Sequence, residues 1–218
     1  MSTGGVLVDE LLIWFSFIGR AICHQLHERT FQINETYLPI CARDTGIYLG
    51  VLTTLVYLFI TKKFKKTMIP NKTISFLLLT MLCPMMIDGI GSYLGFYETN
   101  NAIRLITGIL FGSSLPFFLL PLLHSQNSVE SPILKKISEI NTPLFSAAIL
   151  GLFVYHSLLP VLIISSLLIL SLICWFSVLT SFLFLKVRHK SIRLLLAVSC
   201  SILSLIILSF VHSLSLGT

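Results

Sequence analysis

Long apolar stretches alternate with short polar ones along most of this chain. A helix crosses a bilayer with roughly 20 apolar residues, because each residue rises about 1.5 Å through a core about 30 Å thick. One charge-free run, from Pro143 to the residue before Lys186, has room for two such helices with a turn near Ser157–Pro160. The pattern predicts six spans, at residues 45–61, 73–95, 102–124, 143–159, 161–185 and 192–213.

The first segment, residues 1–22, is apolar over a shorter length. Asp9 and Glu10 precede LLIWFSFIG and Arg20 follows it, which leaves about nine uninterrupted apolar residues. That is too short to cross an undistorted bilayer. The segment also lacks the basic start and small-residue cleavage site of a secretory signal. It is therefore predicted to be a retained helix that lies in the membrane interface or inserts partly.

Composition supports a membrane protein. Hydrophobic residues make up 55% of the 218 positions and charged residues only 11%, whereas soluble domains average about 25% charged. The mean hydropathy is +0.93. The sequence predicts an all-α polytopic membrane bundle, one membrane domain over residues 1–218, with membrane lipids as its surroundings.

The net charge of +6 follows from where the basic residues lie. Three loops that fall on one side of six alternating spans hold eleven of the fifteen lysines and arginines. By the positive-inside rule these loops are cytoplasmic, so the chain resides in the cell membrane with residues 23–44 and the C-terminus outside. The distribution is explained without nucleic acid, which is not an expected partner.

The polar segment 23–44 gathers groups that a bilayer cannot solvate. Thiolate, imidazole and carboxylate are all zinc ligands, and four of them close a tetrahedron. This segment predicts a site for zinc or another divalent metal. A disulfide, a thiol redox pair and purely structural cysteines stay open as alternatives for its two cysteines. The candidate ligands are Cys23, His24, Cys41 and Asp44.

A second polar group surrounds the turn between residues 95 and 102. Asp88 lies about two helical turns below the outer end of its span, where a carboxylate needs a cation, a metal or a proton. Arg43, Arg29 or a metal held by segment 23–44 are the candidate partners. Glu98 is the expected ion partner of Arg104, which lies one turn into the next helix.

Small residues recur four apart at Gly91 and Gly95, and again at Gly108 and Gly112. Such pairs let helix backbones approach closely in lipid. Because only a short turn separates residues 73–95 from residues 102–124, these glycines predict a tight hairpin between the two spans.

Two segments resemble a known family. Cys23 to Gly50 contains C-H-Q, E-R-T-F and L-P-I-C-A-R-D-T-G-I-Y-L-G, and Pro84 to Gly112 contains D-G-I-G, E-T-N-N and R-L-I-T-G-I-L-F-G. They resemble a family of small bacterial and archaeal polytopic membrane proteins of unknown function. Its pattern looks like C-H, R-S-F and P-V-C-A-R-C-T-G-I-Y, followed by D-G, E-S-N and R-x-x-T-G-x-L-F-G. This resemblance implies no known reaction.

One departure from that pattern matters for the chemistry. The family pattern has C-A-R-C, whereas this chain has Asp44 in place of the second cysteine. A redox pair would therefore have to use Cys23 with Cys41. A metal site can accept an aspartate oxygen in place of a thiolate, at some loss of softness.

Three functions fit these residues. In the first, an outward-facing enzyme acts on an anionic lipid or isoprenoid head group. Its catalytic residues would be Asp88, His24 and Arg104, and its substrate-binding residues Arg29, Arg43, Glu98 and Asn101. In the second, a non-catalytic accessory subunit docks a protein partner on the polar segment. In the third, a small transporter moves protons or cations through Asp88.

Overall fold

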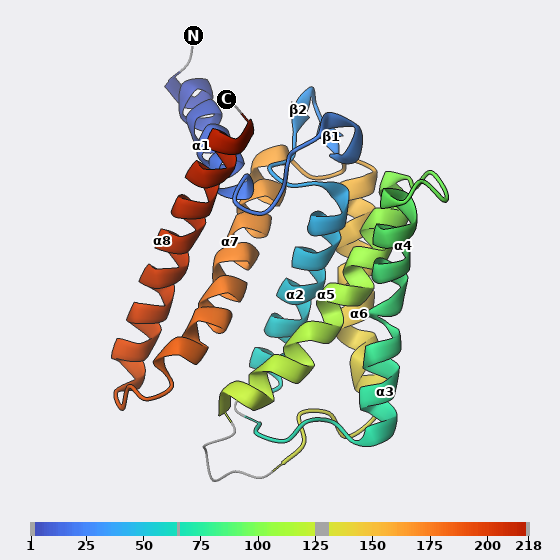
Figure 1. Ribbon diagram of the computed structural model, residues 1–218, viewed down its shortest axis with the longest axis vertical. Helices are drawn as coiled ribbons and strands as arrows, with labels where there is room; N and C mark the ends of the chain where they lie inside the picture. Colours follow the sequence, from blue (N-terminus) through green and yellow to red (C-terminus); the bar gives the residue numbers. More distant parts are fainter. Residues whose placement is uncertain (1–2, 65, 125–130, 217–218) are drawn as a thin grey trace. The chain divides into compact units, whose positions relative to one another are not determined.

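The computed structural model describes residues 3–64, 66–124 and 131–216, and it is all-α apart from one short hairpin (Figure 1). This confirms the predicted membrane helical bundle. The elements in chain order are α1 (Thr3–Gly19), η1 (His27–Arg29), β1 (Gln32–Ile33), β2 (Thr36–Tyr37), α2 (Ala42–Ile60), α3 (Lys72–Thr80), α4 (Cys83–Tyr93), α5 (Asn101–His124), α6 (Ser138–Tyr155), α7 (Val161–Thr180), η2 (Ser181–Phe184) and α8 (Lys190–Leu216).

The chain divides into two compact units. Unit 1 consists of residues 1–41 and 153–218, and unit 2 of residues 42–152. Unit 1 thus combines the N-terminal helix and hairpin with α7 and α8. Unit 2 holds α2 to α5 and most of α6. The single membrane domain stays a prediction.

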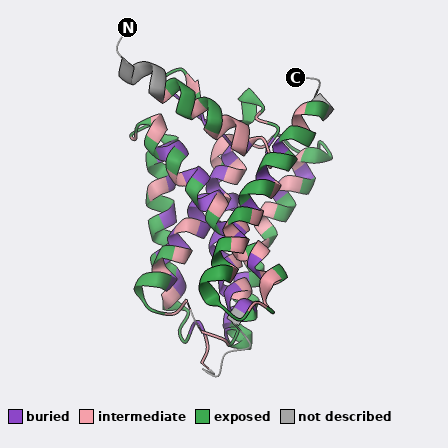
Figure 2. Ribbon diagram, turned by 90° about the vertical axis from the view of Figure 1, so that its left-hand side faces the viewer, coloured by how far each residue is buried: buried purple, intermediate pink, exposed green. Residues whose placement is uncertain are grey.

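Helices occupy all six predicted spans. Among the described residues, five helical segments are long and apolar enough to cross a membrane: Ala42–Ile60, Lys72–Tyr93, Asn101–Leu123, Val161–Phe184 and Lys190–Leu214. The helix at the sixth predicted span, α6, is not among these five; it begins in the polar sequence Ser-Glu-Ile-Asn and ends at Tyr155, close to the predicted turn. Buried and exposed residues alternate along the helices (Figure 2). Many of the exposed side chains are large and apolar, as contact with lipid requires.

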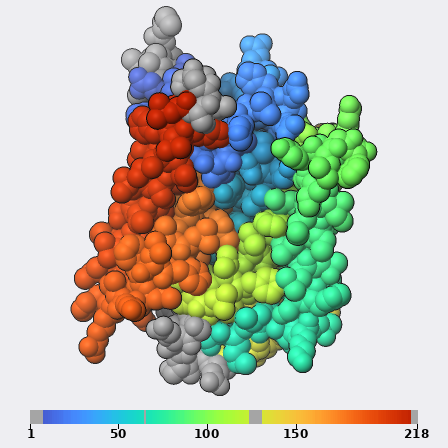
Figure 3. Space-filling model, in the orientation of Figure 1, coloured from blue at the N-terminus to red at the C-terminus, as the bar shows by residue number. Residues whose placement is uncertain are grey.

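The predicted span 73–95 is a broken helix in unit 2. α3 ends at Thr80, and α4 starts at Cys83 with Pro84 in its first turn. Proline has no N–H and its ring crowds the carbonyl four residues earlier, which here belongs to Thr80. The break is therefore placed by Pro84. The resulting α3–α4 segment, teal to green, lies on the surface of its unit (Figure 3).

Glycines allow α2 and α5 to pack closely against each other. A Cβ added to Gly46 would lie 2.3 Å from the Leu105 carbonyl oxygen, and one added to Gly112 would lie 2.0 Å from that of Ile47. Gly108 likewise faces the backbone of Arg43. α4 and α5 do pack against each other, as the sequence predicted, but Gly108 and Gly112 face α2 instead of α4. Small-residue spacing indicates close approach but does not name the partner helix.

In unit 1, hydroxyl groups link α7 to α8. The Ser177 and Ser201 hydroxyls lie 2.9 Å apart, and the Thr180 hydroxyl donates to the Ala197 carbonyl at 2.8 Å. Near the other end of α8, the Ser209 hydroxyl donates to the Phe17 carbonyl of α1 at 2.6 Å. These bonds satisfy polar side chains that would otherwise face hydrocarbon.

The polar segment contains a hairpin that its sequence pattern did not predict. β1 and β2 pair antiparallel, with Gln32 opposite Tyr37 and Ile33 opposite Thr36. The two turn residues, Asn34 and Glu35, have φ of 47° and 66°. These are the left-handed angles of a two-residue type I′ turn, for which Asn-Gly is the favoured sequence.

Replacing Glu35 with glycine should stabilise the protein by about 0.5–1 kcal/mol, because glycine adopts a positive φ without a Cβ clash. The midpoint of unfolding in detergent would measure this. Thr36→Gly, which removes a side chain from β2 itself, should lower the midpoint. A lower midpoint for Glu35→Gly as well would contradict the turn assignment.

Candidate functional site

The thiols of Cys23 and Cys41 come together in unit 1. Their sulfur atoms lie within 4.8 Å of each other. Cys23 is buried and Cys41 half-buried. The Cys23 sulfur accepts two backbone N–H groups, from Cys41 at 3.2 Å and from Gln25 at 3.4 Å. Backbone donors aimed at one sulfur fix its orientation, as hydrogen bonds do for the ligand atoms of metal sites.

Two residues of unit 1 hold these cysteines together. Gln25 has a φ of 52°, and its side-chain amide donates to the Ser16 carbonyl at 2.6 Å and the Pro39 carbonyl at 2.8 Å. Gly19, at the end of α1, lets the same stretch approach, since a Cβ there would lie 2.2 Å from the Pro39 oxygen. The end of α1 is thereby fixed against the residues that lead to Cys41.

The other candidate residues of segment 23–41 have separate surroundings. The His24 ring meets the ring of His212 on α8 edge to face, with centroids 4.4 Å apart, and the His212 Nδ1 lies 2.7 Å from the Arg20 carbonyl oxygen. Arg29 is exposed at the end of η1. The proposed roles of His24 as a ligand and Arg29 as an anion contact stay predictions.

Asp88 forms the most complete polar cluster in unit 2. Its side chain is only 2% exposed. One carboxylate oxygen accepts from the Arg43 guanidinium. The other accepts from the Tyr97 hydroxyl at 2.9 Å and the Thr99 hydroxyl at 2.5 Å. Arg43 was one of the partners suggested by the sequence, whereas Tyr97 and Thr99 were missed.

The chain after α4 folds back to supply these two hydroxyls. Gly95 has a φ of +74°, and the Phe96 N–H donates to the Gly91 carbonyl at 3.0 Å, which closes the helix in a Schellman-type turn. The Tyr97 ring then lies against Gly91, where a Cβ would come within 2.6 Å of it. Partial desolvation, and then the hydrogen bond to Asp88, raise the pKa of Tyr97 above its usual value, so the phenol stays a donor.

The remaining candidates lie near the ends of the spans in unit 2. Arg104 donates to the Asn101 side chain at 3.1 Å, and Glu98 is exposed. The ion pairs of unit 2 include Arg43–Asp88 and Lys63–Glu139, and the expected Glu98–Arg104 pair stays a prediction. Asp44 is half-buried in the first turn of α2.

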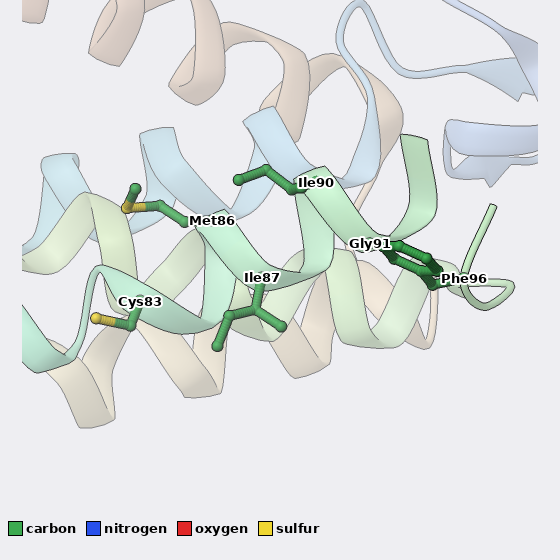
Figure 4. Close-up of a pocket in the computed structure, with 6 residues that line it drawn as sticks. All are labelled: Cys83, Met86, Ile87, Ile90, Gly91 and Phe96. Atoms are coloured by element: carbon green, nitrogen blue, oxygen red, sulfur yellow. The ribbon is translucent and has the colours of Figure 1, made fainter. Parts of the chain in front are cut away.

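An apolar groove of about 490 Å³ lies on the surface of α4. The lining side chains stand along the helix, and Phe96 from the following turn lies at one end (Figure 4). This groove contains no charged group. Its lining consists of Cys83, Met86, Ile87, Ile90, Gly91 and Phe96.

Comparison with known protein families matches residues 23–118 to one described as Predicted membrane protein (DUF2085). A Methanothermobacter thermautotrophicus protein is 40% identical over 108 residues, which cover 48% of this chain and 90% of the relative. The chain belongs to this family. Both stretches that carried the sequence resemblance fall within the matched residues.

A second family relative comes from Methanocaldococcus jannaschii. It is 39% identical over 101 residues, which cover 46% of this chain and 63% of the relative. Both relatives are described as uncharacterised proteins. No solved structure matches the chain. The shared stretch includes both thiols and the whole Asp88 cluster, and α7 and α8 lie outside it.

Proposed function

We propose that this chain is a membrane metalloprotein whose polar segment binds a divalent transition metal, with zinc the best fit, through Cys23 and Cys41. The observation that carries the proposal is the convergence of the two thiols with two N–H donors on the Cys23 sulfur. Thiolates select zinc and other soft metals over magnesium or calcium. Hydrogen bonds to a ligand atom fix its orientation around such a metal.

The rest of the coordination shell is inferred from the sequence. Asp44 comes three residues after Cys41 in the sequence and offers a carboxylate oxygen, which zinc accepts. With two thiolates and one carboxylate, a fourth position is open to water or to an external ligand. An open position is the property that separates catalytic zinc sites from structural ones.

An anionic lipid or isoprenoid head group is the ligand that we propose for this position. The segment is predicted to lie outside the membrane, next to the head groups. Arg29 and His24 are exposed in it. Guanidinium groups bind phosphate through charge-assisted hydrogen bonds, so Arg29 would orient the head group while the metal polarises one of its oxygens.

The transporter alternative receives less support. A proton or cation carrier has to exchange its ligand, and the Asp88 carboxylate already accepts hydrogen bonds from three side chains. The catalytic role proposed for Asp88 receives less support for the same reason. Asp88 instead resembles a structural anchor that positions Arg43 and the 97–99 turn.

The metal can be tested directly on the full chain purified in detergent. Zinc content measured by mass spectrometry should approach one per chain in wild type and fall to background in Cys41→Ser, because one thiolate alone is a weak site. Cys83→Ser, which removes an exposed cysteine on α4, should keep the metal.

Other results would overturn the proposal. Equal metal in wild type and Cys41→Ser would remove Cys41 from the site. Two thiols that become reactive only after reduction would identify a disulfide instead. The same preparations test the head group: lipid phosphate that copurifies with wild type should decrease in Cys41→Ser and not in Cys83→Ser.

A further inference from the structure

Two loops far apart in sequence join at one end of unit 2. The Met68 N–H donates to the Ser131 carbonyl at 3.2 Å, and the Ile133 N–H donates to the Met68 carbonyl at 3.0 Å. Met68 and Pro132 thereby form a parallel bridge. We call the described residues of these loops, 61–64, 66–72 and 131–139, the basic platform.

Two buried apolar side chains and one ion pair hold the basic platform in place. Ile133 and Leu134 are fully buried. The Lys63 ammonium lies 2.8 Å from the Glu139 carboxylate, which also accepts the Lys135 N–H at 3.0 Å. Partial desolvation raises the pKa of Glu139, but these hydrogen bonds outweigh it and hold the pKa below its usual value. The pair is therefore charged at neutral pH.

Excess positive charge is left on the platform surface. Its described residues include six lysines and one acid, and Glu139 is paired with Lys63. No other ion pair is present among these described residues. Lys72 adds its charge at the N-terminus of α3, where the helix dipole is also positive. The exposed lysines are Lys62, Lys72, Lys135 and Lys136.

Apolar side chains stand among these lysines. Met68 is 47% exposed, Ile69 44% and Ile137 47%. The platform connects the end of α2 to the first residue of α3, and both helices belong to candidate membrane spans. It therefore lies at the depth where a bilayer changes from hydrocarbon to head groups. Lysines beside exposed apolar residues are the pattern of a surface that contacts anionic lipid.

We infer that the basic platform binds the head groups of anionic phospholipids in the surrounding membrane. Two loops make one binding surface, with Met68, Ile69 and Ile137 in the upper acyl region and the lysines at the phosphates. This inference does not depend on the metal site, since none of its residues lies in segment 23–44.

The test uses native mass spectrometry of the full chain in detergent. It measures the preference for phosphatidylglycerol, which is the ratio of bound phosphatidylglycerol to bound phosphatidylcholine. In Lys72→Gln/Lys135→Gln/Lys136→Gln, preference for phosphatidylglycerol should fall roughly 100-fold at low salt, about fivefold per lysine. It should weaken in wild type as salt rises. The matched control is Lys186→Gln/Arg188→Gln/Lys190→Gln, which removes three exposed charges from unit 1 and should keep the preference.

Two further variants make the outcome decisive. Arginine at the same three platform positions keeps the charge and should retain the preference, which separates binding from folding. Cys41→Ser should lose at most the head group proposed at the metal site, and it should keep the salt-sensitive preference that depends on the platform lysines. Equal preference in wild type and the platform glutamine variant would overturn the inference, and so would an equal loss in the control.

Discussion

Asp88→Ala should lower the free energy of unfolding by about 3–5 kcal/mol, because it leaves the Arg43 guanidinium without its buried counter-ion. Tyr97 and Thr99 would lose their acceptor in the same step. Denaturant titration in detergent would measure the loss. The effect should be largest on the turn after α4, which the two hydroxyls tie to the helix.

Glu98→Ala is the control for this effect. Glu98 belongs to the same turn but is exposed, so its loss should change the free energy of unfolding by less than about 0.5 kcal/mol. The double variant Asp88→Ala/Arg43→Ala should lose less free energy of unfolding than the two single variants lose together, since no charge is then left unpaired. Additive losses would show that the two side chains do not stabilise each other.

Gly112→Ala should cost about 3 kcal/mol, at the upper end of the cost of overpacking. Its new Cβ would lie 2.0 Å from the Ile47 oxygen, and a backbone atom cannot turn aside as a side chain can. α2 and α5 would have to move apart. Thermal unfolding in detergent would report the loss, and a cysteine cross-link between the two helices would report the separation.

Gly89→Ala is the matched control on α4. Outside the helix's own backbone, the nearest atom to a new Cβ there is a guanidinium nitrogen of Arg43, 4.0 Å away. Alanine is a better helix former than glycine by about 1 kcal/mol. Stability should therefore be unchanged or slightly higher. If Gly112→Ala behaved like Gly89→Ala, the close backbone approach of α2 and α5 would be refuted.

The sequence was sufficient where burial alone decides the structure. Apolar runs of span length fix the helices, because a bilayer leaves few other ways to satisfy a backbone. The depth of Asp88 in such a run required a polar partner, and Arg43 was among those named. Bilayer chemistry thus predicted the all-α fold and one contact of the polar cluster.

The sequence was insufficient where geometry between segments decides. Tyr97 and Thr99 reach Asp88 only because Gly95 reverses the chain, and many turns could follow an α-helix at that point. The glycines of α5 indicated contact without identifying α2. The β1–β2 hairpin was missed because its strands have two residues each, too few for an alternating pattern to emerge.

The glycine seam between α2 and α5 also constrains biosynthesis. During translation α2 enters the bilayer before α5, and α3 and α4 are synthesised between the two. Until then, lipid acyl chains must cover the glycine face of α2, which is shaped to pack against the backbone of α5. The nascent chain therefore passes through a stage in which lipid occupies the glycine face of α2, and α5 displaces that lipid when it arrives.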